Sequence, residues 1–319
     1  MTCMYQCRIC TNSKNNRTFT VQEMMFGLGD SFEYFECAKC GCLQIGEIPG
    51  DLSRYYPDDY YSFTVPGVNP VKRFLKRRWI GYALGEGGLV GWTMIRLRGA
   101  PAYAGWIGKI RANPDHAILD IGCGQGHLLL DLQNLGFSNL TGVDSHIEKD
   151  IQYGEHVRVL KRPLSELEGQ FDLVMLHHSF EHMIEQAGTL KEVWRLLKPG
   201  KLALLRIPLS GSYAWQTYGV NWSQLDAPRH LFLHTVESIS LLAGQAGFRI
   251  VETVYDSTSF QLWGSEQYRR GVPLTDARSF LKGSSLFSRT ELKEFEAKAR
   301  ELNGQSAGDQ ACFYLLKPG

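Results

Sequence analysis

Two pairs of cysteines near the N-terminus have the spacing of a tetrahedral metal site. Cys7 and Cys10 form one C-x-x-C pair, and Cys37 and Cys40 form a second pair after 26 intervening residues. Each pair can hold a metal ion through a tight turn, and four thiolates close the coordination sphere of zinc. The spacing therefore predicts a structural zinc site in a ribbon with extended strands.

Residues 1–50 contain six of the eight cysteines of the chain and no histidine. Cys3 and Cys42 fall outside the two pairs, and either could replace a predicted ligand. A ribbon of this kind can bind nucleic acid, but the segment contains few lysines and arginines and five acidic residues offset them, which disfavours that role. We interpret residues 1–50 as a small module that helps to position a substrate.

A second group of side chains could perform acid–base or metal chemistry. His178, Glu181 and His182 have the spacing i, i+3 and i+4, which predicts that they share one face of a helix. A divalent metal on that face would lower the pKa of a substrate hydroxyl and orient it. Glu-His pairs at such places are also common without a metal, and these residues then have positioning roles.

The segment from Asp226 to His230 has the sequence Asp-Ala-Pro-Arg-His and lies in a long connection. His230 is the candidate general base, because an imidazole can accept a proton near neutral pH. Asp226 and Arg229 are candidates for substrate binding. A guanidinium can bind a phosphate bidentately, and an internal salt bridge is the alternative for Arg229.

The third chemical signal is a glycine loop with an acidic partner. The loop contains Asp120, Gly122, Gly124 and Gly126, and Asp144 follows 18 residues later at the end of the next apolar run. A carboxylate there can accept hydrogen bonds from both ribose hydroxyls of an adenosine ligand. The third glycine comes one residue earlier than in the dinucleotide fingerprint G-x-G-x-x-G, which favours a ligand without a pyrophosphate.

Alternating apolar runs and helical patterns predict the elements that position these residues. Strands are expected at 117–121, 140–143, 157–160, 171–176, 202–207, 250–254 and 311–316. Helices are expected at 127–134, 188–197, 236–246 and 290–302. This alternation predicts an α/β fold with a mostly parallel sheet covered on both faces. Composition divides the chain into regions 1–50, 51–110 and 111–319.

Four motifs in residues 115–255 resemble, in order and spacing, those of the class I S-adenosylmethionine (SAM) dependent methyltransferases. They are Gly122 to Gly126, Gly142 to Asp144, Phe171 to Val174 and Leu197 to Gly200. The resemblance implies a Rossmann-like, seven-stranded sheet whose last strand is antiparallel, with SAM over the ends of the first and fourth strands. It also implies cofactor contacts from the glycine loop and Asp144.

The same resemblance places His177, at the end of the fourth strand, on the methionine side of the cofactor. The spacing of His178, Glu181 and His182 is similar to the E-x-x-E-H metal site of small-RNA 2′-O-methyltransferases and some ubiquinone-pathway O-methyltransferases. His178 stands where that motif has its first glutamate, and His230 could supply a further ligand. Whether a divalent metal binds here stays open.

The cysteine module, the tyrosine-rich stretch Tyr55–Tyr61 and the segment Asp226–His230 together resemble the zinc-ribbon methyltransferases of polysaccharide and deoxysugar metabolism. That resemblance implies a small hydroxylated substrate, a sugar or a nucleotide-linked sugar. An RNA methyltransferase that uses the ribbon as a clamp, with assistance from a metal, is the alternative function. A non-catalytic SAM-binding scaffold is a third interpretation.

The composition is that of an ordinary soluble globular protein, and the N-terminus lacks the apolar core of a signal peptide, so we expect a cytoplasmic protein. Apolar residues make up 44% of the chain and charged residues 21%, and the formal net charge is +1. We therefore expect no nucleic-acid partner and no membrane span. Residues 79–95 are apolar but short and rich in glycine, so we interpret them as linker helices packed on the main domain. Contact with a membrane surface is the alternative.

Overall fold

The computed structural model describes residues 5–319 except 57–69, 84, 86, 100–101 and 111–112. Its chain divides into two compact units. Unit 1 contains Met1–Pro57, His178–Leu190 and Leu205–Leu315, and unit 2 contains Asp58–His177, Lys191–Leu204 and Leu316–Gly319. Cys3 and the end of the tyrosine-rich stretch lie outside the described residues.

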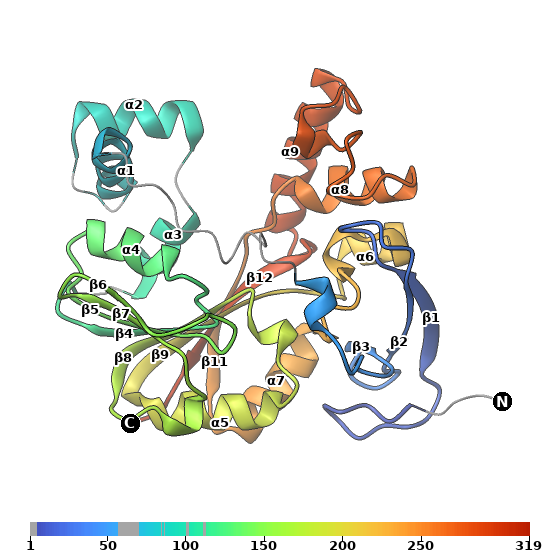
Figure 1. Ribbon diagram of the computed structural model, residues 1–319, viewed down its shortest axis with the longest axis horizontal. Coiled ribbons are helices and arrows are strands. Elements are labelled where there is room, and N and C mark those ends of the chain that lie inside the picture. Colours follow the sequence, from blue (N-terminus) through green and yellow to red (C-terminus); the bar gives the residue numbers. More distant parts are fainter. Residues whose placement is uncertain (1–4, 57–69, 84, 86, 100–101, 111–112) are drawn as a thin grey trace. The chain divides into compact units, whose positions relative to one another are not determined.

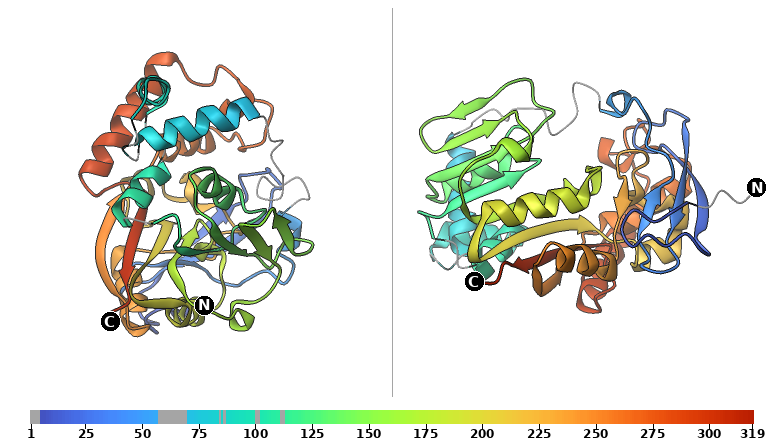
Figure 2. Two further views of the ribbon diagram at one scale, coloured as in Figure 1. Left: turned by 90° about the vertical axis from the view of Figure 1, so that its left-hand side faces the viewer. Right: turned by 90° about the horizontal axis from the view of Figure 1, so that it is seen from below.

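Parallel strands form the centre of unit 2. They are β4 (Ala117–Ile121), β5 (Asn139–Val143), β7 (Val157–Leu160) and β8 (Phe171–His177). β4 pairs with β5 and β8, and β5 pairs with β7, all in parallel. These strands lie side by side in Figure 1 and Figure 2, and their apolar residues are buried as expected for strands covered on both faces.

Each of these four strands was expected from the sequence within one residue. The short strand β6 (Ile151–Tyr153) was not expected, and it pairs antiparallel with β7 at the edge of the sheet. The expected count of seven strands is therefore not reproduced. On the other side of β8 the sheet continues with β9 (Leu197–Pro208), which starts in unit 2 and ends in unit 1.

The helices that start in unit 2 are α1 (Pro70–Ala83), α2 (Leu89–Arg98), α3 (Ala102–Ile110) and α4 (His127–Asn134). α4 directly follows the glycine loop and has the expected bounds. Helix α5 (Gln186–Leu196) contributes residues to both units. Among the described residues, none of the helices combines the length and the apolar character that crossing a membrane requires.

The N-terminal part of unit 1 forms a four-stranded sheet together with one strand from later in the chain. Its order is β1 (Arg17–Gln22), β2 (Ser31–Glu36), β3 (Leu43–Ile45) and β10 (Phe232–Leu233). β10 is contributed by a distant part of the chain, and it pairs antiparallel with β3. The sheet thus ties the cysteine module directly to the residues that follow His230.

The rest of unit 1 contains α6 (Tyr213–Tyr218), α7 (Val236–Gln245), α8 (Phe260–Arg269), α9 (Arg289–Gly304), β11 (Arg249–Tyr255) and β12 (Gln310–Leu316). β12 lies between β11 and β9. The expected helices α7 and α9 are confirmed within two residues. Each begins with a capping box, at Thr235 and Ser288 respectively, which satisfies backbone donors of the first turn. Helix α8 was not expected.

Candidate functional site

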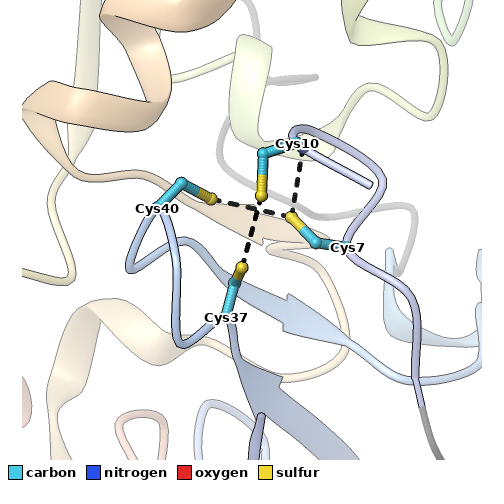
Figure 3. Close-up of side chains that lie close together, drawn as sticks. All are labelled: Cys7, Cys10, Cys37 and Cys40. Carbon is cyan, nitrogen blue, oxygen red and sulfur yellow. Dashed lines mark hydrogen bonds between the residues drawn. The ribbon is translucent and has the colours of Figure 1, made fainter. Parts of the chain in front are cut away.

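The four cysteines of the two C-x-x-C pairs converge on one point (Figure 3). The Sγ atoms of Cys7 and Cys40 are 3.6 Å apart, those of Cys10 and Cys37 are 3.4 Å apart, and all four lie within 4.8 Å of one another. Sulfur atoms about 2.3 Å from a zinc ion lie about 3.8 Å from each other in a tetrahedron. The arrangement is therefore compatible with a bound zinc ion.

Hydrogen-bond donors surround the sulfur of Cys7. Gln44 Nε2 donates to this sulfur at 2.9 Å, and the backbone N–H of Ile9 donates at 3.4 Å. The hydrogen bond with Cys40, together with these donors, lowers the pKa of Cys7 to about 4. Cys42 is fully buried outside the cluster, with its sulfur 3.8 Å from Nδ1 of His234 rather than beside the other sulfurs. The cluster thus has the four members expected from the spacing.

The three glycines of the glycine loop all require a left-handed backbone. Gly122, Gly124 and Gly126 have φ values of 71°, 53° and 80°, a region in which a Cβ is strained. A Cβ on Gly126 would also lie 2.8 Å from Cγ2 of Val159. The loop can therefore turn sharply between β4 and the start of α4, where a ligand's anionic or polar groups can meet a helix N-terminus.

Asp144 and Asp120 flank this loop, and their pKa values are shifted in opposite directions. Asp144 Oδ2 accepts the Gly124 N–H at 2.8 Å, and Oδ1 accepts the His146 N–H at 2.8 Å. Burial would raise the pKa of Asp144, but these hydrogen bonds and His146 lower it. Burial and the neighbouring charge of Asp144 raise the pKa of Asp120 to about 8. One carboxylate is therefore ionised at neutral pH, and the other needs a cation to be ionised.

His177 ends β8, and its ring stacks on Trp106 of α3. The ring centroids are 4.4 Å apart, with an interplanar angle of 25°. The cofactor contact expected for His177 stays a prediction, and the stacking identifies Trp106 as a neighbour that sequence reasoning did not find.

His178 does not lie on a helical face with Glu181 and His182, as the sequence predicted. It has a left-handed φ of 50°, and residues Phe180–His182 form only a short 3-10 turn. Arg206 Nη1 lies 2.7 Å from His178 Nε2. Because a guanidinium only donates, this nitrogen accepts, and Nδ1 donates to Glu181 Oε1 at 3.2 Å. Arg206 in turn pairs with Asp256 at 2.7 Å, so His178 has no nitrogen left for a metal or a substrate proton.

Glu181 is a fully buried carboxylate with one unsatisfied oxygen. Its Oε1 accepts from His178, and Oε2 has no hydrogen-bond partner among the described residues. Burial would raise the pKa of Glu181, but the hydrogen bond from His178 and the charges of the neighbouring histidines lower it to about 2. A buried, ionised oxygen without a partner is costly, and it marks this place as one that a cation or a donor can occupy.

His182 and His230 face each other next to Glu181, with ring centroids 4.7 Å apart. His182 Nδ1 donates to the carbonyl of Arg229 at 2.9 Å, and His230 Nδ1 donates to the carbonyl of Gln224 at 2.7 Å. Both backbone contacts place the proton on Nδ1 and leave Nε2 as an acceptor. Burial and the neighbouring His230 lower the pKa of His182 to about 4, so His182 is neutral at pH 7.

Two carboxylates lie near the acceptor nitrogen of His230. Its Nε2 is 3.9 Å from Glu181 Oε1 and 3.9 Å from Asp226 Oδ2. The backbone carbonyl of His230 also accepts the hydroxyl of Tyr34 of β2 at 2.8 Å. His230 is therefore held in place from both sides and is able to accept a proton.

Arg229 forms an internal ion-pair network rather than an open phosphate site. Its side chain is fully buried, and it donates to Glu23 at 2.9 Å, to Asp226 at 2.6 Å and to the carbonyl of Tyr55 at 3.3 Å. The geometry therefore agrees with the salt-bridge alternative for Arg229. Asp226 is occupied by the same pair, so a direct role of either residue in substrate binding has no support from these contacts.

Several residues of this site were not identified from the sequence. Glu23, Tyr34 and Tyr56 come from the N-terminal part of the chain, and the hydroxyl of Tyr56 lies 3.1 Å from Nδ1 of His182. Arg206 holds His178 from β9. The resemblance of the tyrosine-rich stretch was the only signal that pointed to one of them.

A protein-family model matches the part of the chain that contains the glycine loop. Residues 99–253 match a family model described as "Methyltransferase domain". The match includes the loop, Asp144, the 178–182 turn and His230. Residues 99–253 therefore resemble a methyltransferase domain.

Two curated relatives are ubiquinone biosynthesis O-methyltransferases. The protein of Pseudomonas aeruginosa is 28% identical over 111 residues, which are 31% of this chain and 47% of that protein. The protein of Caulobacter vibrioides is 28% identical over 139 residues, which are 36% of this chain and 55% of that protein. The chain thus spans about half the length of these relatives.

Among solved structures, the chain is similar to the 1,6-didemethyltoxoflavin-N1-methyltransferase of Burkholderia thailandensis, determined with S-adenosylhomocysteine. The sequence identity is 16%, the TM-score is 0.41, and the alignment covers 80% of this chain and 93% of that one.

Proposed function

We propose that this protein transfers the methyl group of SAM to a hydroxyl group of a small metabolite, a sugar or a nucleotide-linked sugar. The proposal rests on the hydrogen bond and the neighbouring groups of the His230 imidazole. Its Nδ1 proton is fixed by the Gln224 carbonyl, and among the described residues its Nε2 has no hydrogen-bond donor and lies 3.9 Å from each of two carboxylates. This is the arrangement that a general base requires.

SAM supplies an electrophilic methyl group on a sulfonium when it is bound. The chain must then hold the acceptor in line and remove its proton, and positioning contributes much of the rate. In the proposed reaction His230 Nε2 accepts the hydroxyl proton, and Asp226 and Glu181 stabilise the resulting imidazolium. His182 stays neutral beside the Tyr56 hydroxyl.

The substrate class rests on charge and on the relatives. The curated relatives are named O-methyltransferases, which supports an oxygen acceptor. The net charge of +1 favours a small metabolite over a nucleic acid. Because Arg229 is buried in its ion pairs, a phosphate of a nucleotide sugar must be bound by other groups, and the sugar hydroxyls are the chemically relevant part.

The test is the release of S-adenosylhomocysteine with a panel of nucleotide sugars and free sugars. Each active sugar is paired with an analogue in which one hydroxyl is replaced by hydrogen. We expect one hydroxyl per active sugar to be essential, with a mass gain of one methyl group on that oxygen. Tight SAM binding with no active sugar would count against the substrate class.

We further propose that the four-cysteine cluster holds a structural zinc ion and that residues 1–50 act as its module. Four thiolates leave no open coordination position, so the ion would stabilise the fold rather than take part in chemistry. The donors around Cys7 support this proposal because they stabilise a thiolate ligand.

Replacement of Asp144 by alanine is expected to weaken SAM binding. The carboxylate orients the Gly124 N–H, and in the bound state it would accept ribose hydroxyls. Loss of such bonds costs about 1–3 kcal/mol, which is roughly fivefold to 150-fold in the dissociation constant. Calorimetric titration with SAM measures the effect. Asp150→Ala is the matched control on the exposed surface, and equal affinity in the two variants would overturn the assignment of Asp144.

SAM affinity is expected to increase with pH between about 5.5 and 7.5. In the free protein Asp120, with a pKa of about 8, is mostly protonated over this range. A bound cation favours the ionised carboxylate and lowers this pKa, so binding releases a proton and becomes tighter as pH rises towards 8. Calorimetry in buffers of different ionisation enthalpy measures the released proton.

Asp120→Asn should remove this pH dependence. His146 also titrates near the loop, because Asp144 raises its pKa, so His146→Gln serves as the control and should keep the dependence. A flat profile in the wild-type protein, or an unchanged slope in the Asp120→Asn variant, would contradict a cation beside Asp120.

A metal-assisted reaction is the second candidate, and one observation favours it. Ligand atoms of Glu181, His182 and His230 lie within 4.8 Å of one another, and Glu181 Oε2 has no hydrogen-bond partner in the part of the chain that the structure describes. Adjacent ligands about 2.1 Å from a metal lie about 3 Å apart, so the three groups would have to move closer together. Titration with Mn²⁺, followed by electron paramagnetic resonance, decides the question: binding that Glu181→Gln abolishes would support the metal.

The charges of the cysteine module give less support to RNA than to a sugar as the methyl acceptor. Arg8 donates to the carbonyls of Ile45 and Gly46, and Arg17 pairs with Glu36. Two of the four lysines and arginines of residues 1–50 are thus engaged within the module itself, and its five acidic residues outnumber the remaining Lys14 and Lys39, so it offers little positive charge for phosphates.

A further inference from the structure

Helices α1 and α2 form a tightly joined pair. Trp79 Nε1 of α1 donates to the carbonyl of Gly99, directly after α2, at 2.8 Å. Gly91 of α2 approaches the Arg78 carbonyl oxygen so closely that a Cβ there would collide with it. Figure 1 shows the two helices side by side. The pair thus presents one defined surface, which we call the α1–α2 surface.

This surface exposes an unusual share of the large apolar side chains. Of fourteen exposed large hydrophobic residues in the described part of the chain, six lie on these two helices: Val71, Phe74, Leu89, Val90, Trp92 and Leu97. Leu89 and Leu97 are each 78% exposed. Single exposed apolar residues are normal, but such a concentration in 24 helical residues marks an interaction surface.

The same helices are strongly cationic. Their sequences contain seven lysines and arginines and no acidic residue, whereas the whole chain has a net charge of only +1. Arg78 lies 5.4 Å from the ring centroid of Phe74, and Arg96 lies 5.2 Å from that of Trp92. Each helix therefore presents an arginine and an aromatic ring together, four residues apart.

The exposed apolar side chains and the positive charge together distinguish between the partners that could bind the α1–α2 surface. A phosphate backbone would attract the cations but would leave Leu89 and Leu97 in water. A second copy of this surface would bring like charges together. An anionic lipid surface satisfies both features, because acyl chains cover apolar side chains, headgroups attract arginine, and tryptophan prefers the interface. Helices of 14 and 10 residues are too short to span a bilayer of about 30 Å.

We propose that the α1–α2 surface binds the surface of an anionic phospholipid bilayer, with its apolar side chains inserted at the headgroup level. Of the two interpretations that the sequence left open for residues 79–95, the exposed side chains favour membrane-surface contact. The proposal is independent of the methyl acceptor.

Co-sedimentation of the full chain with vesicles tests the proposal. We expect binding to vesicles of phosphatidylglycerol mixed with phosphatidylcholine, weak binding to phosphatidylcholine alone, and a decrease as salt is raised. The double variant Leu89→Ser, Leu97→Ser should bind at least about tenfold more weakly. Arg96→Glu should bind about fivefold more weakly or worse.

Two matched variants make the result specific to this surface. Leu281 is 58% exposed elsewhere, so Leu281→Ser should bind as the wild type does, and so should Lys293→Glu on α9. All variants should retain SAM affinity, which reports correct folding. No binding of the wild type to anionic vesicles would overturn the proposal. So would an equal loss in the matched variants, RNA binding that is stronger and insensitive to the leucines, or a dimer that only the leucine variant dissociates.

Discussion

Replacing His230 by alanine is expected to reduce turnover about 10²–10⁴-fold while SAM affinity stays nearly the same. The variant removes the only histidine nitrogen of the 178–230 cluster that is both unprotonated and flanked by two carboxylates. The glycine loop belongs to the other compact unit, so cofactor binding should not change. Steady-state kinetics combined with calorimetric titration of SAM measures the two effects separately.

A structural role of His230 can be distinguished from catalysis. The Tyr34 hydroxyl contacts the backbone of residue 230 rather than its side chain, so the loop should keep its anchor in the alanine variant. Added imidazole should restore part of the turnover. His156→Ala, on an exposed histidine, is the matched control. Full turnover of the His230→Ala variant would exclude His230 as the base.

Loss of zinc is expected to have the largest effect on stability. Structural zinc contributes about 10–16 kcal/mol in small zinc-binding modules at pH 7, which is comparable to the total stability of a domain. Cys37→Ser should lose the ion, lower the unfolding temperature and reduce turnover. Metal analysis, thermal unfolding and kinetics of the purified variant measure these three effects.

Turnover should fall because the cysteine module holds the loop that contains His230, the proposed base. β3 pairs with β10, two residues after His230, and Thr235 Oγ1 donates to the carbonyl of Cys40 at 2.6 Å. Cys42→Ala is the control, because Cys42 lies outside the cluster and this variant should retain one zinc per chain. If Cys37→Ser folds poorly, titration of the wild-type protein with a chelator gives the same information. A protein that keeps its turnover without zinc would contradict the coupling.

Local signals in the sequence predicted much of the fold. β4 and α4 have the expected bounds because an apolar run, a glycine turn and a helical period are properties of neighbouring residues. The four clustered cysteines were likewise identified from two short spacings. β6 and β10 were missed, since strands of three and two residues carry no periodic signal of their own.

The arrangement around the candidate base depends on contacts that no local pattern contains. Arg229 pairs with Glu23, which is 206 residues away, and a guanidinium in a sequence looks the same whether it binds a phosphate or a buried carboxylate. His178 was expected on a helix because its spacing to Glu181 fits one. Its left-handed backbone instead directs it to Arg206, a residue of a later strand.

The most direct test of the central claim is transfer of label from methyl-labelled SAM into two separate acceptor pools. One pool contains nucleotide sugars and free glycans, the other contains total RNA, and wild-type and His230→Ala proteins are compared in each. Label in the sugar pool that the variant fails to produce is the predicted result. Label in RNA alone, or equal labelling by both proteins, would contradict a sugar methyltransferase with His230 as its base.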